Sequence, residues 1–452
     1  MSFQIELAQL TKIIGGIAVN FSSDAGDQIA SGITTDTRNL KQGDVFVALV
    51  GQKFDGHEFV ENAVKIGAVA LITSRKVSVN IPEYIPQFIV ENTLEAYQKI
   101  ARWWRDKFSI PIIGITGSVG KTTTKELIAA VLKTRGTVLK TEANYNNEIG
   151  VPKTILGLQA QHKYAVVEMA MRARGEIALL TQIARPTIGV ITNVGTAHIG
   201  RLGSVEAIAE AKCELLAQMP FSSIAILNGD DRRLIETASR VWHGKTVTYG
   251  LEAGDISGEY QEGQTLRVEG IDLPLPIPGR HNASNYLAAL AVGKVLGLDL
   301  TTLKKGLSVS LPEGRSQRYQ LPNDIVILDE TYNAGLESTI AALHLLKETS
   351  GLRHIAVLGT MKELGANSSQ LHRQVGETVQ ELGMDLLFVL VDEAETEAMV
   401  VGAAGVASEC FRDRAELVKR LKETVRSGDR LLFKASNSVG LNRVVEEFRA
   451  QF

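Results

Sequence analysis

The residues best suited to chemistry lie in a glycine-rich turn, Thr116-Gly117-Ser118-Val119-Gly120-Lys121-Thr122-Thr123. An apolar run at 110–115 precedes this turn, and a helix-forming stretch at 126–132 follows it. A strand that passes through such a turn into a helix points several backbone N–H groups at one spot, which favours a phosphate. Lys121 can reach the terminal phosphates of a nucleotide, and the Thr122 hydroxyl can hold a magnesium ion.

The turn departs from the strict G-x-x-x-x-G-K-[ST] spacing, because Ile115 stands where the first glycine is expected. Its glycines are Gly114, Gly117 and Gly120, so the sequence predicts a variant P-loop. The alternative is a glycine-rich turn that binds no ligand. The order of strand, Gly-Lys-Thr and helix favours the P-loop, and the predicted ligand is ATP or GTP with magnesium.

Further candidates follow apolar runs that read as buried parallel strands at 165–168, 188–192 and 224–227. Polar side chains that follow such strands gather at the carboxyl edge of the sheet, where ligands bind. Glu168 is the candidate acidic magnesium ligand, with a surface carboxylate as the alternative. His198 can hold a second metal or orient a ligand, and the alternative is an ordinary loop histidine.

Two segments are harder to interpret from chemistry alone. Lys212 lies in helix-forming sequence, where a lysine is normally a solvated surface charge, and the residues by themselves favour that interpretation. The run at 228–231, Asn-Gly-Asp-Asp, is either a turn or a polar lining of the site.

Three later residues are candidates for nucleotide contacts. Asn282 lies at a helix start, three residues before Asn285, and the two amides can bind an adenine edge or cap the helix. Arg315 follows a glycine and can reach a γ-phosphate, or it pairs with a surface acid. Asp329 follows a strand and suits a ribose or substrate contact, with an Asx turn as the alternative.

Length and hydrophobic patterning indicate about three α/β domains. Residues 1–107 read as a small α/β unit with strands at 45–49 and 68–73. Residues 108–311 read as a central P-loop domain with a parallel sheet, in which strands and helices alternate. Residues 312–452 read as a Rossmann-like, doubly wound domain. The strands expected in that last domain are at 325–328, 354–358, 386–391 and 430–434, and the helices are at 336–347 and 370–381.

The net charge, the cysteine count and the hydrophobic pattern of the sequence argue against several classes of function. The formal net charge of −3 gives no electrostatic reason to expect a nucleic acid or an anionic membrane as partner. Two cysteines, Cys213 and Cys410, indicate thiols in a reducing compartment and no disulfide framework or zinc site. No secretory signal and no membrane span is visible, so a cytoplasmic location is expected.

These motifs together resemble the ATP-dependent Mur ligases, which build the peptide stem of bacterial cell walls. The segments that carry the resemblance are 116–123, Glu168, 193–198, Ala211-Lys212, 279–282 and Gly314-Arg315. Other segments resemble the members of the family that add D-alanyl-D-alanine. These are 144–152, 175–178, 329–334 and Glu363-Leu364-Gly365. The N-terminal segments 35–38 and 55–57 resemble the uridine-nucleotide-binding domain of such enzymes.

The resemblance implies roles for single residues. It makes Lys212 a carbamylated, anionic magnesium ligand, which reverses the interpretation from the residues alone, and it makes His198 a holder of the second metal. It places Asn282 at the adenine, and it makes Arg315 and Asp329 contacts to ATP from the third domain. The residues implied in binding the uridine nucleotide are Asp36, Thr37 and Arg38.

The implied reaction is an amide ligation that uses ATP and two magnesium ions. The carboxylate that ends a UDP-N-acetylmuramoyl-tripeptide attacks the γ-phosphorus of ATP, and the amine of D-alanyl-D-alanine then attacks the resulting acyl phosphate. The products are the UDP-muramoyl-pentapeptide, ADP and phosphate. Lys121, Lys212, His198 and Arg315 are the implied catalytic residues, and the expected protein is a monomer with no nucleic-acid partner and no membrane insertion.

The main alternatives are another Mur-type amino-acid-adding ligase and a folylpolyglutamate synthetase. A P-loop switch that only hydrolyses nucleotide is the alternative from another class. Several positions depart from the family's usual pattern, and two of them weaken any transfer of dipeptide-binding roles. These two are Thr360, where aspartate is common, and Lys434-Ala435-Ser436-Asn437, which replaces a Lys-Gly-Ser-Arg-like run.

Overall fold

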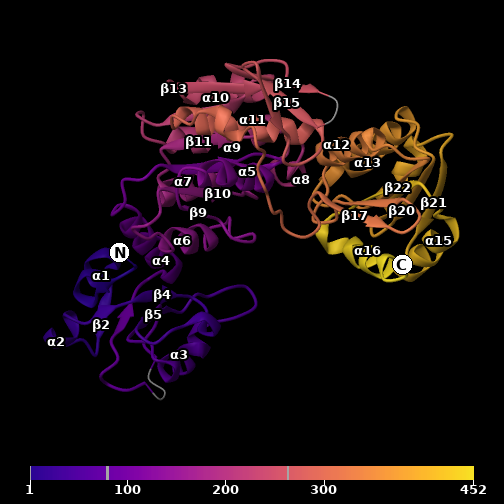
Figure 1. Cartoon of the computed structure of the whole chain (residues 1–452). Coiled ribbons are helices and arrows are strands. Elements are labelled where there is room, and N and C mark those ends of the chain that lie inside the picture. The colour runs from indigo at the N-terminus through magenta and orange to yellow at the C-terminus, as the bar shows by residue number, and fades with distance from the viewer. Residues whose placement is uncertain (1, 78–80, 262–263) are drawn as a thin grey trace.

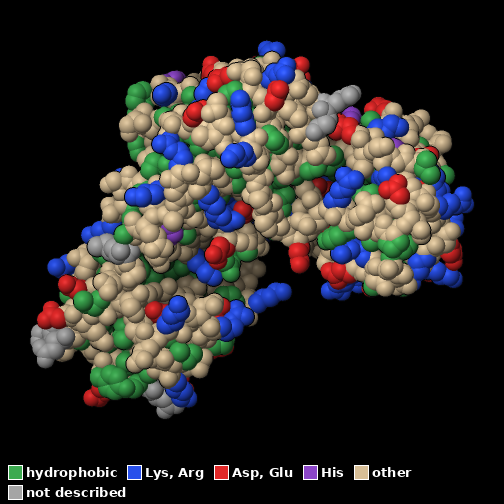
Figure 2. All heavy atoms as spheres, viewed as in Figure 1, with side chains coloured by type: hydrophobic (Ala, Val, Ile, Leu, Met, Phe, Trp, Pro, Cys, Tyr) green, Lys and Arg blue, Asp and Glu red, His purple; other side chains and the backbone are tan. Residues whose placement is uncertain are grey.

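The computed structural model describes residues 2–77, 81–261 and 264–452, which form three α/β bodies (Figure 1). The predicted three-domain α/β fold is confirmed. The N-terminal and C-terminal bodies both adjoin the middle one, and Figure 2 shows an open hollow between the two outer bodies. The predicted boundary at 107/108 lies between helix α4 (Thr93–Arg105) and strand β8 (Ile112–Thr116). The predicted boundary at 311/312 lies between η3 (Leu300–Leu303) and β17 (Gln317–Leu321).

The N-terminal body is a five-stranded sheet in the order β2-β7-β6-β5-β4, with a separate pair of β1 and β3. Strands β4 to β7 are parallel to one another, whereas β2 is antiparallel to β7, so the ends of β4, β5 and β6 share one edge. Its elements are β1 (Ile5–Glu6), α1 (Leu7–Ile14), β2 (Ile17–Val19), α2 (Ser23–Gly26), β3 (Ile29–Ala30), β4 (Gly32–Thr34), η1 (Thr37–Asn39), β5 (Asp44–Val47), η2 (Gly56–Phe59), α3 (Val60–Ile66), β6 (Ala70–Thr73), β7 (Gln87–Ile89) and α4 (Thr93–Arg105).

The middle body is a nine-stranded sheet in the order β16-β15-β14-β13-β12-β11-β8-β10-β9. The P-loop strand β8 lies between β10 and β11 and is parallel to both. Its elements are β8 (Ile112–Thr116), α5 (Lys121–Lys133), β9 (Val138–Lys140), α6 (Gly150–Leu156), β10 (Tyr164–Glu168), α7 (Glu176–Ala184), β11 (Ile188–Ile191), α8 (Ile199–Leu202), α9 (Val205–Gln218), β12 (Ile224–Asn228), α10 (Arg232–Val241), β13 (Lys245–Gly250), β14 (Ile256–Gln261), β15 (Thr265–Val268), β16 (Ile271–Pro274), α11 (Arg280–Val295) and η3 (Leu300–Leu303).

One prediction for this body is wrong. Strands and helices were expected to alternate throughout it, yet β13 to β16 follow one another without a helix. Strands β14, β15 and β16 form an antiparallel ribbon that needs only short turns. The ribbon has alternating burial, and its inner side chains Leu266, Val268 and Leu273 cover one flank of helix α11.

The C-terminal body is a six-stranded sheet in the order β17-β18-β22-β19-β20-β21. Only β17 is antiparallel to its neighbour, and the other strands are parallel, so the doubly wound prediction is confirmed. Its elements are β17 (Gln317–Leu321), β18 (Ile325–Asp329), α12 (Leu336–Glu348), β19 (Arg353–Gly359), η4 (Gly365–Asn367), α13 (Ser368–Glu381), β20 (Leu386–Leu390), η5 (Ala394–Glu397), α14 (Ala398–Gly402), β21 (Ala407–Phe411), α15 (Arg414–Thr424), β22 (Asp429–Lys434), η6 (Asn437–Val439) and α16 (Leu441–Arg449).

Helix α4 belongs structurally to two bodies at once. At its start, the Thr93 hydroxyl donates to the Ala48 carbonyl of the N-terminal body at 3.0 Å. At its end, the buried Trp104 indole N–H donates to the Leu158 carbonyl of the middle body at 3.1 Å, and Arg105 donates to the carbonyl of Ala184 at 3.0 Å. The helix therefore joins the two bodies through buried contacts at both ends.

None of the helices within 2–77, 81–261 and 264–452 combines the length and the apolar character that crossing a bilayer requires.

We expect the Trp104→Ala substitution to destabilise the junction of the N-terminal and middle bodies. The side chain is 1% exposed and lies 5.0 Å from the Phe3 ring and 5.2 Å from the Phe108 ring, centroid to centroid, so its loss leaves a large cavity. The expected decrease in the free energy of unfolding is about 3–5 kcal/mol. Urea denaturation followed by circular dichroism measures it. Trp104→Phe is the matched control with a smaller cavity, and equal stability of the Ala variant and the wild type would contradict the shared-helix assignment.

Candidate functional site

The glycine-rich turn has the conformation of a phosphate-binding loop. It follows the fully buried strand β8 and passes at Gly120, whose φ is +81°, into helix α5. A Cβ atom at Gly117 would lie 1.9 Å from the Thr192 hydroxyl, and one at Gly120 would lie 2.6 Å from the Asn285 side-chain oxygen. Both positions therefore require glycine. The backbone amides of this turn remain at the positive end of helix α5.

Lys121 is held against the loop from which it projects. Its ammonium donates to the carbonyls of Gly117 at 2.7 Å and Ser118 at 3.1 Å. Burial lowers the pKa of Lys121 to about 8; the negative charge of Glu168 opposes this shift, and the positive charge of Arg315 adds to it. In the part of the chain that the structure describes, no carboxylate forms an ion pair with this ammonium. Its charge is thus available to an anion in the loop.

Glu168 and Thr122 lie together, as a magnesium site requires. Strand β10 aligns Glu168 with Ile115 of the P-loop strand, and the Thr122 hydroxyl donates to Glu168 Oε2 at 2.9 Å. Magnesium binds oxygen ligands and is usually held by one or two carboxylates together with substrate phosphates. A hydroxyl and a carboxylate beside a phosphate loop fit that requirement. Glu168 is 2% exposed, which excludes the surface-carboxylate alternative.

Two partners of Glu168 were missed by the sequence analysis. The Asn146 side-chain amide donates to Glu168 Oε1 at 2.8 Å, and the Lys125 ammonium lies 3.7 Å from Oε2. Lys125 is 1% exposed and also donates to the Thr141 carbonyl at 2.9 Å. The spacing of Lys125, four residues after Lys121 on one helix, was the available signal for its position near the site.

Lys212 is not a solvated surface charge, so the interpretation from the residues alone is wrong. Its side chain, on helix α9, is 1% exposed. Burial holds the pKa of Lys212 well below its usual value, and the positive charge of Lys121 acts in the same direction. Within the described residues its ammonium has no hydrogen-bond or ion-pair partner, although Glu337 is near enough to act on it electrostatically. Burial of helix α9 against the sheet accounts for the failed interpretation.

His198 follows strand β11 on the other side of the P-loop strand. Its backbone has a φ of +68°, a left-handed conformation that is uncommon outside glycine and frequent at functional sites. Its Nδ1 lies 2.6 Å from Glu363 Oε2 of the C-terminal body. Burial lowers the pKa of His198, the charge of Lys121 acts in the same direction, and Glu363 opposes them. Burial and the Lys121 charge thus favour the neutral form of the imidazole.

The predicted adenine contact, Asn282, is connected to the P-loop through Asn285. Gly279 is the N-cap of helix α11, so Asn282 does not cap this helix. Its amide donates to the Pro278 carbonyl at 2.7 Å, and its oxygen accepts from Asn285, the residue that lies against Gly120. The alternative role as a cap is thereby excluded.

Arg315 and Asp329 belong to the C-terminal body, and of the two Arg315 lies near enough to Lys121 to lower its pKa. The Arg315 guanidinium stacks on the Tyr332 ring at 3.7 Å from its centroid, and its Nε is buried without a hydrogen-bond partner among the described residues. It is therefore not an ion-paired surface arginine. Asp329 accepts from the Thr331 backbone N–H at 3.0 Å and from its hydroxyl at 2.6 Å, the Asx-turn arrangement, and burial raises the pKa of Asp329.

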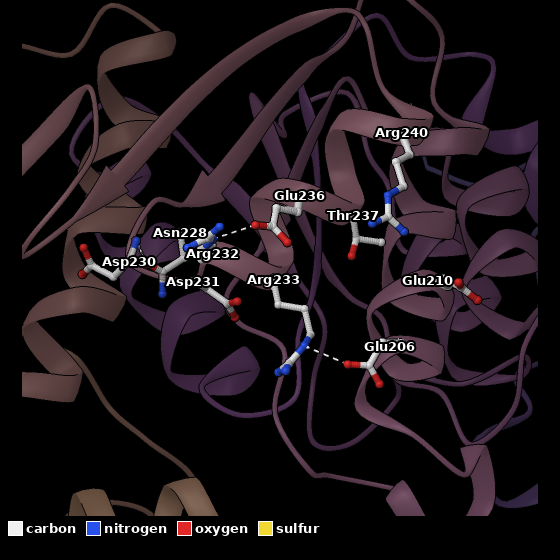
Figure 3. Close-up of a pocket in the computed structure, with 10 residues that line it drawn as sticks. All are labelled: Glu206, Glu210, Asn228, Asp230, Asp231, Arg232, Arg233, Glu236, Thr237 and Arg240. Atoms are coloured by element: carbon white, nitrogen blue, oxygen red, sulfur yellow. Dashed lines mark hydrogen bonds and ion pairs between the residues drawn. The ribbon is translucent and has the colours of Figure 1, made fainter.

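The run at 228–231 is a turn, and one of its residues supports the site loop. Asp231 caps helix α10 through the Leu234 N–H at 2.9 Å and accepts from the Val194 N–H at 2.6 Å. A cavity of about 640 Å³ opens beside this turn and is lined by three arginines and several acids (Figure 3). Lys121, Glu168 and Lys212 do not line it, so this cavity adjoins the P-loop site without containing it.

The predicted uridine-nucleotide residues form a second group, in the N-terminal body. Asp36 and Arg38 follow strand β4 at the shared edge of the sheet, where Arg38 Nη2 lies 2.7 Å from Asp36 Oδ2. Thr37 begins the turn η1 between them. The loop that carries Tyr145 and Asn146 connects the two groups, since Tyr145 acts electrostatically on Arg38 while Asn146 contacts Glu168.

Comparison with known proteins agrees with this arrangement. Residues 30–103 match the model described as Mur ligase family, catalytic domain; residues 115–293 match the Mur ligase middle domain; and residues 314–437 match the Mur ligase, glutamate ligase domain. A UDP-N-acetylmuramoyl-tripeptide–D-alanyl-D-alanine ligase of Synechocystis sp. is 56% identical and covers 100% of this chain and 99% of its own. Its Escherichia coli counterpart is 34% identical over 98% of this chain and 97% of its own.

Solved structures extend the comparison. The crystal structure of MurF from Acinetobacter baumannii is 29% identical, covers 99% of each chain and superposes with a TM-score of 0.89. The MurF ligase of Thermotoga maritima in complex with ADP is 33% identical, covers 93% of this chain and 97% of its own, and has a TM-score of 0.82. The second of these relatives was solved with a nucleotide bound.

We expect the Gly120→Ala substitution to weaken nucleotide binding at least about tenfold, equivalent to about 1.4 kcal/mol. The new methyl group must displace Asn285 and strain the turn where helix α5 begins. Titration calorimetry with ADP and magnesium measures the dissociation constant. Gly26→Ala is the matched control, because its methyl group would meet neighbours at 3.4 and 3.7 Å, ordinary contact distances. An unchanged dissociation constant for Gly120→Ala would mean that nucleotide binds elsewhere.

Proposed function

The chain belongs to the Mur ligase family, and we infer from its full-length similarity to named relatives that it is an ATP-dependent ligase of peptidoglycan synthesis. It joins D-alanyl-D-alanine to a UDP-N-acetylmuramoyl-tripeptide. The observation that carries this function is 56% identity, over 451 residues, to a ligase of that name. The buried Thr122–Glu168 pair beside the P-loop supplies the chemistry that such an enzyme needs.

The reaction proceeds in two covalent steps. A terminal carboxylate oxygen of the tripeptide attacks the γ-phosphorus of ATP, the bond to the bridging oxygen breaks, and ADP leaves. The neutral amine of D-alanyl-D-alanine then attacks the acyl-phosphate carbonyl and the carbon–nitrogen bond of the amide forms. The amine nitrogen loses one proton to solvent, the carbon–oxygen bond to phosphate breaks, and inorganic phosphate leaves with the electron pair. In the first step two anions must meet, so we propose that Lys121 and Arg315 neutralise the triphosphate.

We propose that Thr122 and Glu168 hold one magnesium ion and that His198 and Lys212 hold a second. Bound magnesium would neutralise phosphate charge and align the reacting oxygens. The other nucleotide contacts in this proposal are the backbone and side chains of the P-loop and three residues outside it. These contacts are Gly117, Ser118, Gly120, Thr123, Asn282, Arg315 and Asp329.

Lys212 suits this role as a carbamate. The neutral amine attacks the carbon of carbon dioxide, a nitrogen–carbon bond forms, and one N–H proton passes to solvent, so an anion replaces the ammonium. The support is that Lys212 is buried and that no described residue pairs with its ammonium, a costly arrangement for a cation. Lys121 nearby favours an anion at this position.

The substrate would extend across two bodies. We propose that Asp36, Thr37 and Arg38 bind the uridine nucleotide and that the Tyr145–Asn146 loop guides the peptide to the P-loop. Arg315 of the C-terminal body acts electrostatically on Lys121, and we propose that docking of that body excludes water from the acyl phosphate. All proposed site residues come from one chain, and we propose a cytoplasmic monomer with domains 1–107, 108–311 and 312–452.

A phosphate-release assay tests the function. With ATP, magnesium, the UDP-muramoyl-tripeptide and D-alanyl-D-alanine, the purified chain should form ADP, phosphate and the pentapeptide in equal amounts, as measured by mass spectrometry. Lys121→Ala should reduce this rate by about 10²–10³-fold, because one transition-state cation is lost. Turnover that is equally fast without D-alanyl-D-alanine would instead indicate a nucleotide switch, and turnover with single amino acids alone would indicate another ligase of the family.

Chemical rescue tests the carbamate. Lys212→Ala should lose about 10²-fold or more in rate, and short-chain carboxylic acids should restore part of the activity by supplying the missing anion. Lys212→Arg is the matched control, since it keeps a cation and leaves no room for the acid. Wild-type activity in the Ala variant would contradict the role, as would equal rescue of the Arg variant.

A further inference from the structure

A single segment connects the phosphate-binding turn to the C-terminal body; it consists of residues 193–198 and the short helix α8 (Ile199–Leu202), and is called the 193–202 loop. On one side, the Val119 N–H donates to the Asn193 side-chain oxygen at 3.0 Å, and the Gly195 N–H donates to the Ser118 hydroxyl at 2.8 Å. These and further hydrogen bonds of Ser118 and Val119 fix this loop to the P-loop, so its position depends on the conformation of that turn.

The C-terminal body holds the same loop from the other side. The Thr196 N–H donates to Glu337 at 2.6 Å, and the Gly200 N–H donates to the Glu363 carbonyl at 3.1 Å. A Cβ atom at Gly200 would lie 2.6 Å from the Gly365 nitrogen, so the two backbones are in close contact. Docking of the C-terminal body thus places Glu363 beside His198.

The contact between Glu363 and His198 determines which ring nitrogen carries the proton. Glu363 Oε2 lies 2.6 Å from His198 Nδ1, while Arg201 donates to Oε1 at 3.0 and 2.8 Å. An ionised carboxylate only accepts hydrogen bonds, so the proton of the neutral ring is on Nδ1. Nε2 then has a free electron pair, and among the described residues it has no hydrogen-bond partner.

We propose that Glu363 is a positioning residue of the ligase reaction, which acts through His198 and does so only when the C-terminal body is docked. It holds the ring in the Nδ1–H tautomer, so that Nε2 can accept a bond from a metal or a substrate proton. Carboxylates that fix histidine ligands in this way typically improve metal affinity by about 10–100-fold. The inference rests on the role proposed for His198 in the ligase site.

The left-handed backbone of both partners supports a functional contact. His198 has a φ of +68° and Glu363 a φ of +65°, conformations that cost free energy in residues other than glycine. The Glu363-Leu364-Gly365 segment is also one of those by which the sequence resembles the D-alanyl-D-alanine-adding ligases. Two strained residues that meet across a domain boundary indicate a contact that the fold maintains.

Nitrogen NMR of the histidine rings in the ligand-free protein tests the tautomer. His198→Gln identifies the signal by its disappearance. The wild type should show the Nδ1–H form, Glu363→Ala should shift the ring away from this form, and Glu363→Gln should retain it, because the amide oxygen still accepts from Nδ1–H. Arg201→Ala is the matched control, since it removes interdomain hydrogen bonds and leaves the carboxylate. An unchanged ring in Glu363→Ala would overturn the proposal.

Manganese binding in the presence of ADP, followed by electron paramagnetic resonance, is the second measurement. Glu363→Ala should weaken the weaker manganese site about 10–100-fold and leave the tighter one unchanged. Equal weakening in Arg201→Ala would show that docking alone matters and would overturn a role through the histidine. Because the NMR measurement needs no nucleotide or substrate, failure of the ligase assay with an intact tautomer result would count against the function and not against this contact.

Discussion

A buried carboxylate, Glu168, organises the middle body. A charge taken out of water is stable only when it is paired and hydrogen-bonded, and losing one partner of such a group typically costs about 3–5 kcal/mol. The partners here are Thr122 of the phosphate-binding helix, Asn146 of a separate loop and Lys125, which is itself buried. Two stretches of chain, helix α5 and the loop at Asn146, must therefore fold correctly around this one side chain. The geometry of the proposed magnesium site and the stability of the domain depend on the same contacts.

The second constraint is that the site is completed from outside the middle body. The loop at 193–202 is bonded to Ser118 and Val119 on one side and to Glu337 and Glu363 on the other. The loop at 193–202 thus links the phosphate-binding turn of the middle body to two carboxylates of the C-terminal body. The C-terminal body is thereby bonded to the same segment that contacts the phosphate-binding turn.

Much of the fold and part of the site could be predicted from the sequence. The P-loop could be predicted because a strand, a glycine-rich turn and a helix follow one another directly in the sequence. Glu168 could be predicted because it ends a parallel strand, and the carboxyl ends of parallel strands lie at the ligand-binding edge of the sheet. Lys212 could not be predicted from its residue type, because its burial depends on which face of α9 meets the sheet. Glu363 could not be assigned to His198 either, since the two are brought together only by domain packing. The antiparallel ribbon β14–β16 was missed because its short strands carry weak hydrophobic patterns.

Helix α4, which is embedded in both the N-terminal and the middle body, sets a molecular length scale. With the uridine nucleotide at Asp36 and Arg38 and the terminal phosphate at Lys121, as proposed, this helix would fix the span that a bound precursor bridges. An extended peptide adds about 3.3–3.6 Å per residue. The carboxylate of a precursor that is one amino acid too short would not reach the phosphates, and the carboxylate of one that is too long would lie beyond them. Under the proposed binding mode, a precursor would therefore be selected by its length before its side chains are recognised.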